Sequence, residues 1–236
     1  RKTEEHKKYM ETHEVQKKRR ISSMRSQAHK RGIPYELSET KEAEITIESA
    51  RCFHCDRQNQ PHLRGLHESS NSSVQTPLGP DRIDPDGAYT DANVVPACAQ
   101  CNLCRGNLSL AEFYTACSNV SLYQHLGISA QHWISYLHTT NNENFSRYRL
   151  RALKHQLSFE LTQDKFRTVC NNPCYGCEST RQVGIDRFDN SLGYTLSTVR
   201  PCCSTCNYLK RHFSFQDFVA MCHAVKCAEV TRNVGR

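Results

Sequence analysis

The sequence predicts an α+β protein built from two tandem copies of one small cysteine-rich module, preceded by basic helices. Three observations predict this architecture: an internal repeat, two C-x-x-C pairs in each copy, and a concentration of positive charge at the N-terminus. At 236 residues the chain has room for two small domains. Its mean hydropathy of −0.69 is low for one large apolar core, so cross-links through its cysteines are expected.

The repeat joins two segments that align without gaps at an offset of 105 residues. Residues 79–102 read GPDRIDPDGAYTDANVVPACAQCN, and residues 184–207 read GIDRFDNSLGYTLSTVRPCCSTCN. Upstream of each, RGIPYELSE (31–39) resembles HQLSFELTQ (155–163). These matches indicate a tandem duplication.

The domain organisation follows from the repeat. We expect a basic N-terminal arm at 1–35, a first module at 36–117, a linker at 118–145 and a second module at 146–236. A polar insertion within about 56–78 lengthens a surface loop of the first copy, and the linker is expected to hold a short helix over 129–138 around Trp133. The sequence begins at Arg1 without a Met, as expected of a processed or trimmed segment. Removal of a targeting peptide is an alternative that the sequence leaves open.

Positive charge is concentrated in the first 35 residues. They contain eleven Lys or Arg and four acidic residues, and the difference, 11 minus 4, equals the formal net charge of +7. A basic arm on a near-neutral body indicates contact with phosphates. The alternative is a solvated helix on the surface of an assembly.

Two C-x-x-C pairs in each copy supply four thiolates that can surround one ion, the pattern of a structural zinc site with no open position. The expected ligands of two Zn²⁺ ions are Cys52, Cys55, Cys98, Cys101, Cys174, Cys177, Cys203 and Cys206. Disulfides or free core thiols are the alternative, and Cys202 could compete with its neighbour as a ligand. The other cysteines, Cys104, Cys117, Cys170, Cys222 and Cys227, are expected to be small buried hydrophobic residues.

Nothing in the sequence resembles a signal peptide or an apolar run of 18 residues. The expected location is therefore an intracellular reducing compartment, with nucleus, cytoplasm and organelle unresolved and no membrane partner.

Local signals place the remaining elements. Helices are expected at 20–30, ended by Gly32, and at 146–155. Each first C-x-x-C should form a tight knuckle, after which the D-R-x-D and Y-T segments should form a hairpin. The second C-x-x-C should open a helix, followed by amphipathic helices near 109–118 and 214–224.

The run D-R-x-D, with G-x-Y-T and N-V-V-P-x-C-x-x-C-N in the first copy, resembles the HNH (ββα-metal, treble-clef) endonuclease family of the zinc-knuckle type. In that family an Asp binds a divalent cation, the following His acts as general base, a middle Asn orients the site, and a final His or Asn completes it. The resemblance implies two treble-clef modules, with Mg²⁺ or Mn²⁺ held by Asp81 and Asn102 and with Asn93 as the middle Asn. In the second copy it implies Asp186 and Asn207.

Both copies depart from the family pattern because Arg82 and Arg187 occupy the place of the general-base His. Arginine cannot readily take a proton from water, although it could clamp a phosphate. Some family members with Arg there use a nearby Tyr, which makes Tyr89 and Tyr194 candidates; hairpin packing is their alternative role. The second copy has also lost the middle Asn, which is replaced by Thr198.

Displaced histidines could compensate for the missing base, although a histidine in a polar loop is usually only solvated. The histidines near the two sites are His54, His62, His67 and His212. The second acid of each D-R-x-D, Asp84 and Asp189, is expected to stabilise the hairpin.

These observations favour a nucleic-acid-binding protein, with DNA preferred and RNA open. The first hypothesis is a metal-dependent DNA endonuclease whose cleavage lies in the first module, the two copies acting as an internal pseudo-dimer. The alternative is a catalytically inactive zinc protein that binds DNA or RNA as a structural subunit of a larger nucleoprotein assembly. A third possibility is a scaffold for protein partners.

Overall fold

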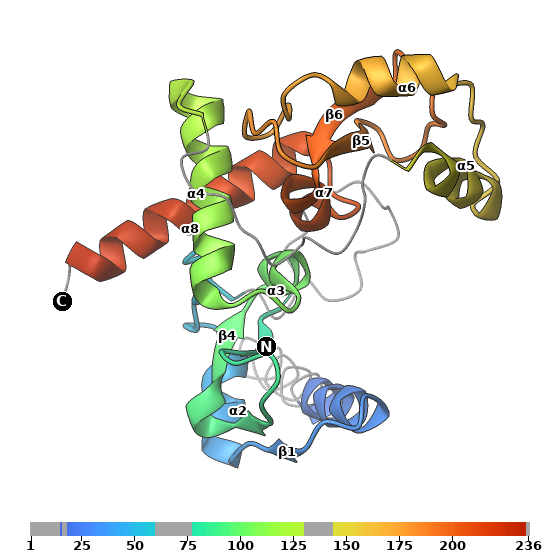
Figure 1. The fold of residues 1–236 in the computed structure, drawn as a ribbon. Coiled ribbons are helices and arrows are strands. Elements are labelled where there is room, and N and C mark those ends of the chain that lie inside the picture. Colours follow the sequence, from blue (N-terminus) through green and yellow to red (C-terminus); the bar gives the residue numbers. More distant parts are fainter. Residues whose placement is uncertain (1–14, 16–17, 60–76, 130–143, 235–236) are drawn as a thin grey trace, which may run out of the picture. The chain divides into compact units, whose positions relative to one another are not determined.

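The computed structural model describes residues 15, 18–59, 77–129 and 144–234. These residues form helices and short two-stranded sheets, so the chain is α+β as predicted (Figure 1). They belong to two compact units, Arg1–Ser109 and Leu110–Arg236. Within the described ranges, no helix is both long enough and apolar enough to cross a membrane.

Unit 1 begins with the predicted basic helix, which is helical over 18–30. It ends as expected at Gly32, where φ is +66°, and the Ile33 N–H turns back to the Ala28 carbonyl at 3.1 Å. Arg25 anchors the helix to the module by donating to both carboxylate oxygens of buried Glu42 at 2.9 and 2.8 Å. The basic segment is therefore docked on unit 1 over its described part.

The rest of unit 1 is a short helix, two small sheets and a second helix. In chain order these elements are β1 (Tyr35–Glu36), α2 (Glu39–Thr46), β2 (Gly79–Arg82), β3 (Tyr89–Thr90), the 3₁₀ turn η2 (Asp91–Asn93), β4 (Val94–Ala97) and α3 (Ala99–Arg105). Ser38 caps α2 through the Lys41 N–H, and its own hydroxyl donates to Asp91 at 2.6 Å. A small buried apolar cluster in unit 1 consists of Leu37, Ile45 and Val94, with Tyr35 and Tyr89 packed against it.

The predicted hairpin between the D-R-x-D and Y-T segments is wrong in its pairing. Strand β2 pairs antiparallel with β4, which places Asp81 opposite Val95. The Y-T segment forms β3 and pairs in parallel with β1, with Tyr89 opposite Tyr35. The physical reason is that a two-residue strand has few backbone groups to share, and the Tyr89 N–H is already donated to Pro34 at 3.0 Å.

Unit 2 repeats this arrangement and adds two long helices. Its elements are α4 (Leu110–Leu126), α5 (Phe145–Lys154), α6 (Gln163–Cys170), β5 (Val183–Arg187), β6 (Val199–Cys203), α7 (Ser204–Lys210) and α8 (Phe215–Val234). Strands β5 and β6 are antiparallel with Asp186 opposite Arg200, and Tyr194 bridges to Phe159 in parallel. The two copies therefore share their strand pairing as well as their sequence pattern.

The boundary between the units differs from the one predicted at 117. Helix α4 belongs to unit 2, and its residues 118–126 are helical rather than linker. There α4 packs against α8, which is the corresponding helix of the second copy (Figure 1). Both bury matched residues of the repeat, Phe113 with Cys117 and Phe218 with Cys222, so burying these faces against each other is the reason for the boundary. The helix predicted around Trp133 and most of the 56–78 insertion lie outside the described residues.

One core cluster of unit 2 is rich in aromatic residues, and this predicts a large effect of substitution at Phe166. Phe166 is 1% exposed and its ring lies 5.6 Å from that of Phe145 and 5.5 Å from that of Tyr148. Phe166→Ala should lower the free energy of unfolding by about 3–5 kcal/mol because it leaves a cavity. Denaturant unfolding measures this, with Leu150→Ala, whose side chain is 65% exposed, as the control. Equal midpoints for the two variants would contradict the assignment of this core.

Candidate metal centres and buried carboxylates

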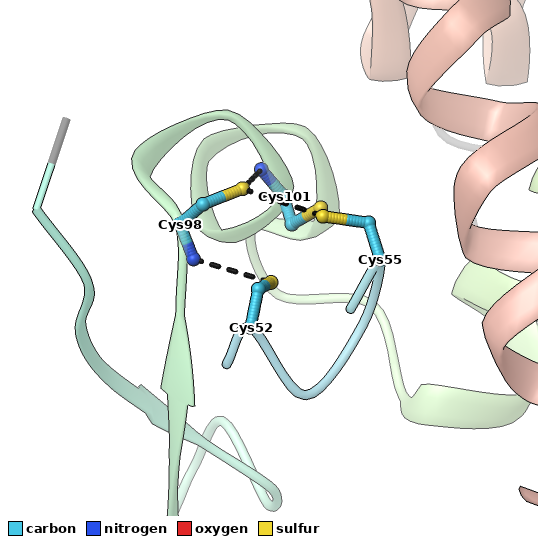
Figure 2. Close-up of side chains that lie close together, drawn as sticks. All are labelled: Cys52, Cys55, Cys98 and Cys101. Carbon is cyan, nitrogen blue, oxygen red and sulfur yellow. Dashed lines mark hydrogen bonds between the residues drawn. The ribbon is translucent and has the colours of Figure 1, made fainter. Parts of the chain in front are cut away.

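Four cysteines of unit 1 converge on one point. Cys52 and Cys55 lie in the knuckle after α2, and Cys98 and Cys101 lie at the start of α3 (Figure 2). Their four Sγ atoms are all within 4.8 Å of one another, and Cys55 and Cys98 are 3.9 Å apart. Two backbone N–H groups donate to these sulfurs, from Cys98 to Cys52 at 3.3 Å and from Cys101 to Cys98 at 3.4 Å. Such bonds favour the thiolate, the form that binds metal.

The second cluster, in unit 2, has the same construction. Cys174, Cys177, Cys203 and Cys206 bring their Sγ atoms within 4.8 Å of one another. The residue after each knuckle has a left-handed backbone, with φ of 58° at Asp56 and 61° at Glu178. Cys203, the predicted choice, belongs to this group, and the neighbouring buried thiol of Cys202 donates to the Cys203 carbonyl at 3.6 Å.

Both clusters fit one tetrahedral ion. Zn–S bonds of about 2.3 Å require neighbouring sulfurs about 3.8 Å apart. The spacings of 3.9 Å in unit 1 and 3.7 Å between Cys177 and Cys203 match this value. None of the cysteines forms a disulfide. The chain therefore carries two Cys₄ groups compatible with two structural metal ions.

Asp81, the expected Mg²⁺ ligand of the first copy, is buried in a network of hydrogen bonds. Its side chain is 5% exposed, and Arg105 donates to its two carboxylate oxygens at 2.8 and 2.6 Å. His54 Nε2 lies 2.8 Å from Asp81 Oδ2, so the nitrogen facing this paired carboxylate is the one that donates. Arg105 is itself 1% exposed and also donates to the Arg82 and Leu108 carbonyls.

Asp186 has a matching network made from different residues. The Tyr175 hydroxyl donates to its Oδ2 at 2.6 Å, and Lys210 Nζ lies 3.1 Å from the same oxygen. Lys210 is fully buried, and its ammonium also reaches the Arg187 carbonyl at 3.4 Å. Burial raises the pKa of Asp186, and Lys210 and the Tyr175 hydroxyl oppose that rise.

Arg105 and Lys210 were absent from the sequence-based site, although a signal for them exists. They stand at the repeat offset of 105, each at the end of the helix opened by the second C-x-x-C. The role of His54 had no comparable signal, because the aligned residue of the second knuckle is Gly176 while the contact is made by Tyr175. The expectation that the histidine is solvated is wrong, since His54 is fully buried.

Arg82 and Arg187, the arginines in place of the family histidine, each contact the turn that follows their strand. Arg82 donates to the Gly87 carbonyl at 2.6 Å, and its guanidinium lies 5.2 Å from the Tyr89 ring centre. Arg187 donates to the Leu192 carbonyl at 2.7 Å and lies 5.1 Å from the Tyr194 ring centre. The Arg–Tyr stack is thus a shared element that orders the turn in both copies.

The middle Asn is used within the turn. Asn93 accepts the Asp84 N–H at 2.9 Å and donates to the Asp84 and Ala88 carbonyls at 3.1 and 2.9 Å. Thr198 takes over the equivalent contact by donating to the Gly193 carbonyl at 2.7 Å. Asp84 also accepts the Asp86 N–H at 3.0 Å, so its predicted stabilising role is confirmed.

Asp189 has the same role in the second copy, where it accepts the Ser191 N–H at 2.9 Å. The predicted final Asn of each copy donates to the strand beside it, Asn102 to Pro80 at 3.2 Å and Asn207 to Ile185 at 3.5 Å. An Mg²⁺ ion at Asp81 and Asn102 therefore finds no support, since both Asp81 oxygens are already bonded to Arg105.

A groove of about 440 Å³ lies between the basic helix and the module in unit 1. Arg20, Gln27 and Arg31 line its helix side, and Tyr89 and Asn102 are among the residues that line its other side. Arg20 also donates to the Pro77 carbonyl at 2.6 Å, which fixes that wall of the groove. Residues 18–31, the helix and the residue after it, carry six Lys or Arg and no acid, so the groove borders a strongly positive segment.

The Asp81–Arg105 pair predicts a large effect of mutation. Arg105→Ala should cost about 3–5 kcal/mol because it leaves a buried carboxylate without its main partner. Arg51→Ala breaks an exposed ion pair with Asp56 and should cost about 0–1 kcal/mol. Unfolding free energies measure both effects. Similar losses of unfolding free energy in the two variants would contradict the larger contribution assigned to the buried pair.

Metal content tests the two Cys₄ groups separately. Cys101→Ser and Cys206→Ser should each remove one tightly bound ion per chain and unfold the module that contains the substitution, since metal binding supplies folding free energy. Elemental analysis after dialysis and circular dichroism measure this. Cys170→Ser, outside both groups, should leave the tightly bound metal unchanged. Retention of both ions in Cys101→Ser would rule out the first group.

No protein-family model matches this chain, and no solved structure matches it. An uncharacterized protein of Acanthamoeba polyphaga mimivirus is 27% identical over 202 residues, which cover 84% of this chain and 35% of that protein. The chain therefore spans about a third of the length of this curated relative.

Proposed function

We propose that this chain binds the phosphate backbone of nucleic acid through the positive groove of unit 1, without cleaving it. In this proposal each module is a treble-clef unit of HNH descent, held by one structural Zn²⁺. Four sulfur ligands at tetrahedral spacing suit Zn²⁺, and a closed set of four leaves no position for chemistry. The observation that carries the proposal is the groove between helix 18–30 and the module.

The groove offers the donors that phosphate contacts need. Exposed Arg31 and the Gln27 amide line the groove, and Arg20 is held there by its bond to the Pro77 carbonyl. Arginine and amide side chains are standard donors to phosphate oxygens. Its volume of about 440 Å³ is in the range of ligand sites, roughly 300–1,000 Å³.

The absence of cleavage is argued from the two buried carboxylates. A metal-dependent nuclease site needs a carboxylate that is free to hold a divalent cation and a base that takes a proton from water. Here Asp81 and Asp186 are each paired with a buried cation, Arg105 or Lys210. The residue that follows each carboxylate is an arginine, a side chain that is a poor proton acceptor. These features support a binding module.

Substitution of Arg31 tests the groove. Arg31→Ala should weaken binding of a short duplex several-fold for DNA and RNA alike, and should reduce the slope of log K against log salt by about one. The matched control is Lys30→Ala, which also removes one positive charge. Lys30 is the exposed last residue of helix 18–30 and does not line the groove. Fluorescence anisotropy across a salt series measures both.

Equal effects of Arg31→Ala and Lys30→Ala would mean that the groove is not the binding site. Cleavage is examined in the same samples by adding Mg²⁺ or Mn²⁺. Nicking of plasmid that disappears in Asn102→Ala with metal content intact would overturn the binding-only proposal and restore the nuclease hypothesis.

A further inference from the structure

Three potential metal ligands outside the Cys₄ groups meet where α4 and α8 lie together in unit 2. His125 lies in the last turn of α4, and His223 and Cys227 lie four residues apart on α8. All three are exposed, which corrects the expectation that Cys227 is a buried hydrophobic residue. Neither the repeat nor the proposed nucleic-acid groove involves them.

Two of the three are already aligned. Residues four apart on a helix lie on one face, and His223 Nε2 is 3.6 Å from Cys227 Sγ. The other nitrogen, Nδ1, lies 3.0 Å from the Oγ atom of Ser121, which is 1% exposed and belongs to α4. A metal-binding histidine usually donates its other ring N–H to an oxygen acceptor, and a hydroxyl can serve as one, which leaves the lone pair of Nε2 directed at the metal. Ser121 can fix this tautomer with Nε2 facing the thiol.

His125 brings the third ligand from the other helix. Its ring centre is 4.3 Å from that of His223, with the ring planes 48° apart. Among the described residues, only the two Cys₄ groups have all of their ligand atoms within 4.8 Å of one another. The His125 side chain must therefore turn to join His223 and Cys227 as a ligand. It is exposed near the end of α4, so rotation about its side-chain bonds displaces no core group.

We propose that His125, His223 and Cys227 form a third metal site, which binds a borderline divalent ion of the Zn²⁺ and Co²⁺ class. Two imidazoles and one thiolate are ligands that suit these ions. Three protein ligands leave the fourth tetrahedral position to water or to an external ligand, unlike the closed Cys₄ groups. Exposure and the need to turn His125 make this site weaker than either Cys₄ group.

Metal titration of the full chain tests the site. Protein purified with its Cys₄ groups filled should take up one further Co²⁺ or Zn²⁺ ion per chain, with visible Co²⁺ bands of a mixed nitrogen and sulfur ligand set. His223→Ala and Cys227→Ser should each abolish that uptake and leave the two tightly bound ions in place. His155→Ala, which removes an exposed histidine elsewhere in unit 2, is the matched control and should bind the extra ion normally.

Absence of uptake beyond the two tightly bound ions would overturn the proposal, as would uptake that survives both His223→Ala and Cys227→Ser. Uptake that is lost in Cys227→Ser but unchanged in His223→Ala would also overturn it, because the thiol would then act without its imidazole partners. His125→Ala should weaken the extra ion at least tenfold if the ligand set is complete as proposed, and an unchanged affinity would remove His125 from it.

Discussion

The fold of each module depends on four thiols that converge on one point. In unit 1 they join the knuckle after α2 to the start of α3, and Cys52 and Cys98 are separated by 46 positions in the sequence. One apolar cluster of unit 1 has three buried members, Leu37, Ile45 and Val94, and burial of each contributes roughly 1.5–3 kcal/mol. A structural Zn²⁺ site supplies about 10–16 kcal/mol, so coordination would outweigh that cluster. With metal bound, coordination would thus let a chain of low mean hydropathy specify two small units.

The buried carboxylate networks are built on this framework. The knuckle supplies one partner, His54 or Tyr175, and the helix opened by the second cysteine pair supplies the cation. Arg105 binds Asp81 through two parallel bonds, whereas Lys210 approaches Asp186 as a single ammonium. The two copies therefore preserve the pairing of charges and the position of the cation, while the donor from the knuckle differs.

Much of this could be predicted from the repeat. The offset of 105 matches Cys98 and Cys101 with Cys203 and Cys206, and so separates Cys203 from Cys202. The parallel pairing of Tyr35 with Tyr89 was not predictable, because a two-residue strand has no hydrophobic period to read. Burial of His54 was missed since its contact with Asp81 crosses 27 residues and has no aligned counterpart. Exposure of Cys227 was missed because a single cysteine on a long helix carries no signal of the face it occupies.

The same charge balance decides between binding and cleavage in the proposed function. For Asp81 to hold a divalent cation, Arg105 would have to give up both of its bonds to the carboxylate while staying buried at 1% exposure. An uncompensated buried charge costs several kcal/mol, and the Arg82 and Leu108 carbonyls would lose their donor as well. The six cations of residues 18–31 face no such cost, since most of them are exposed and the groove beside them is open. Electrostatics therefore favours phosphate at the groove over a metal ion at the carboxylate.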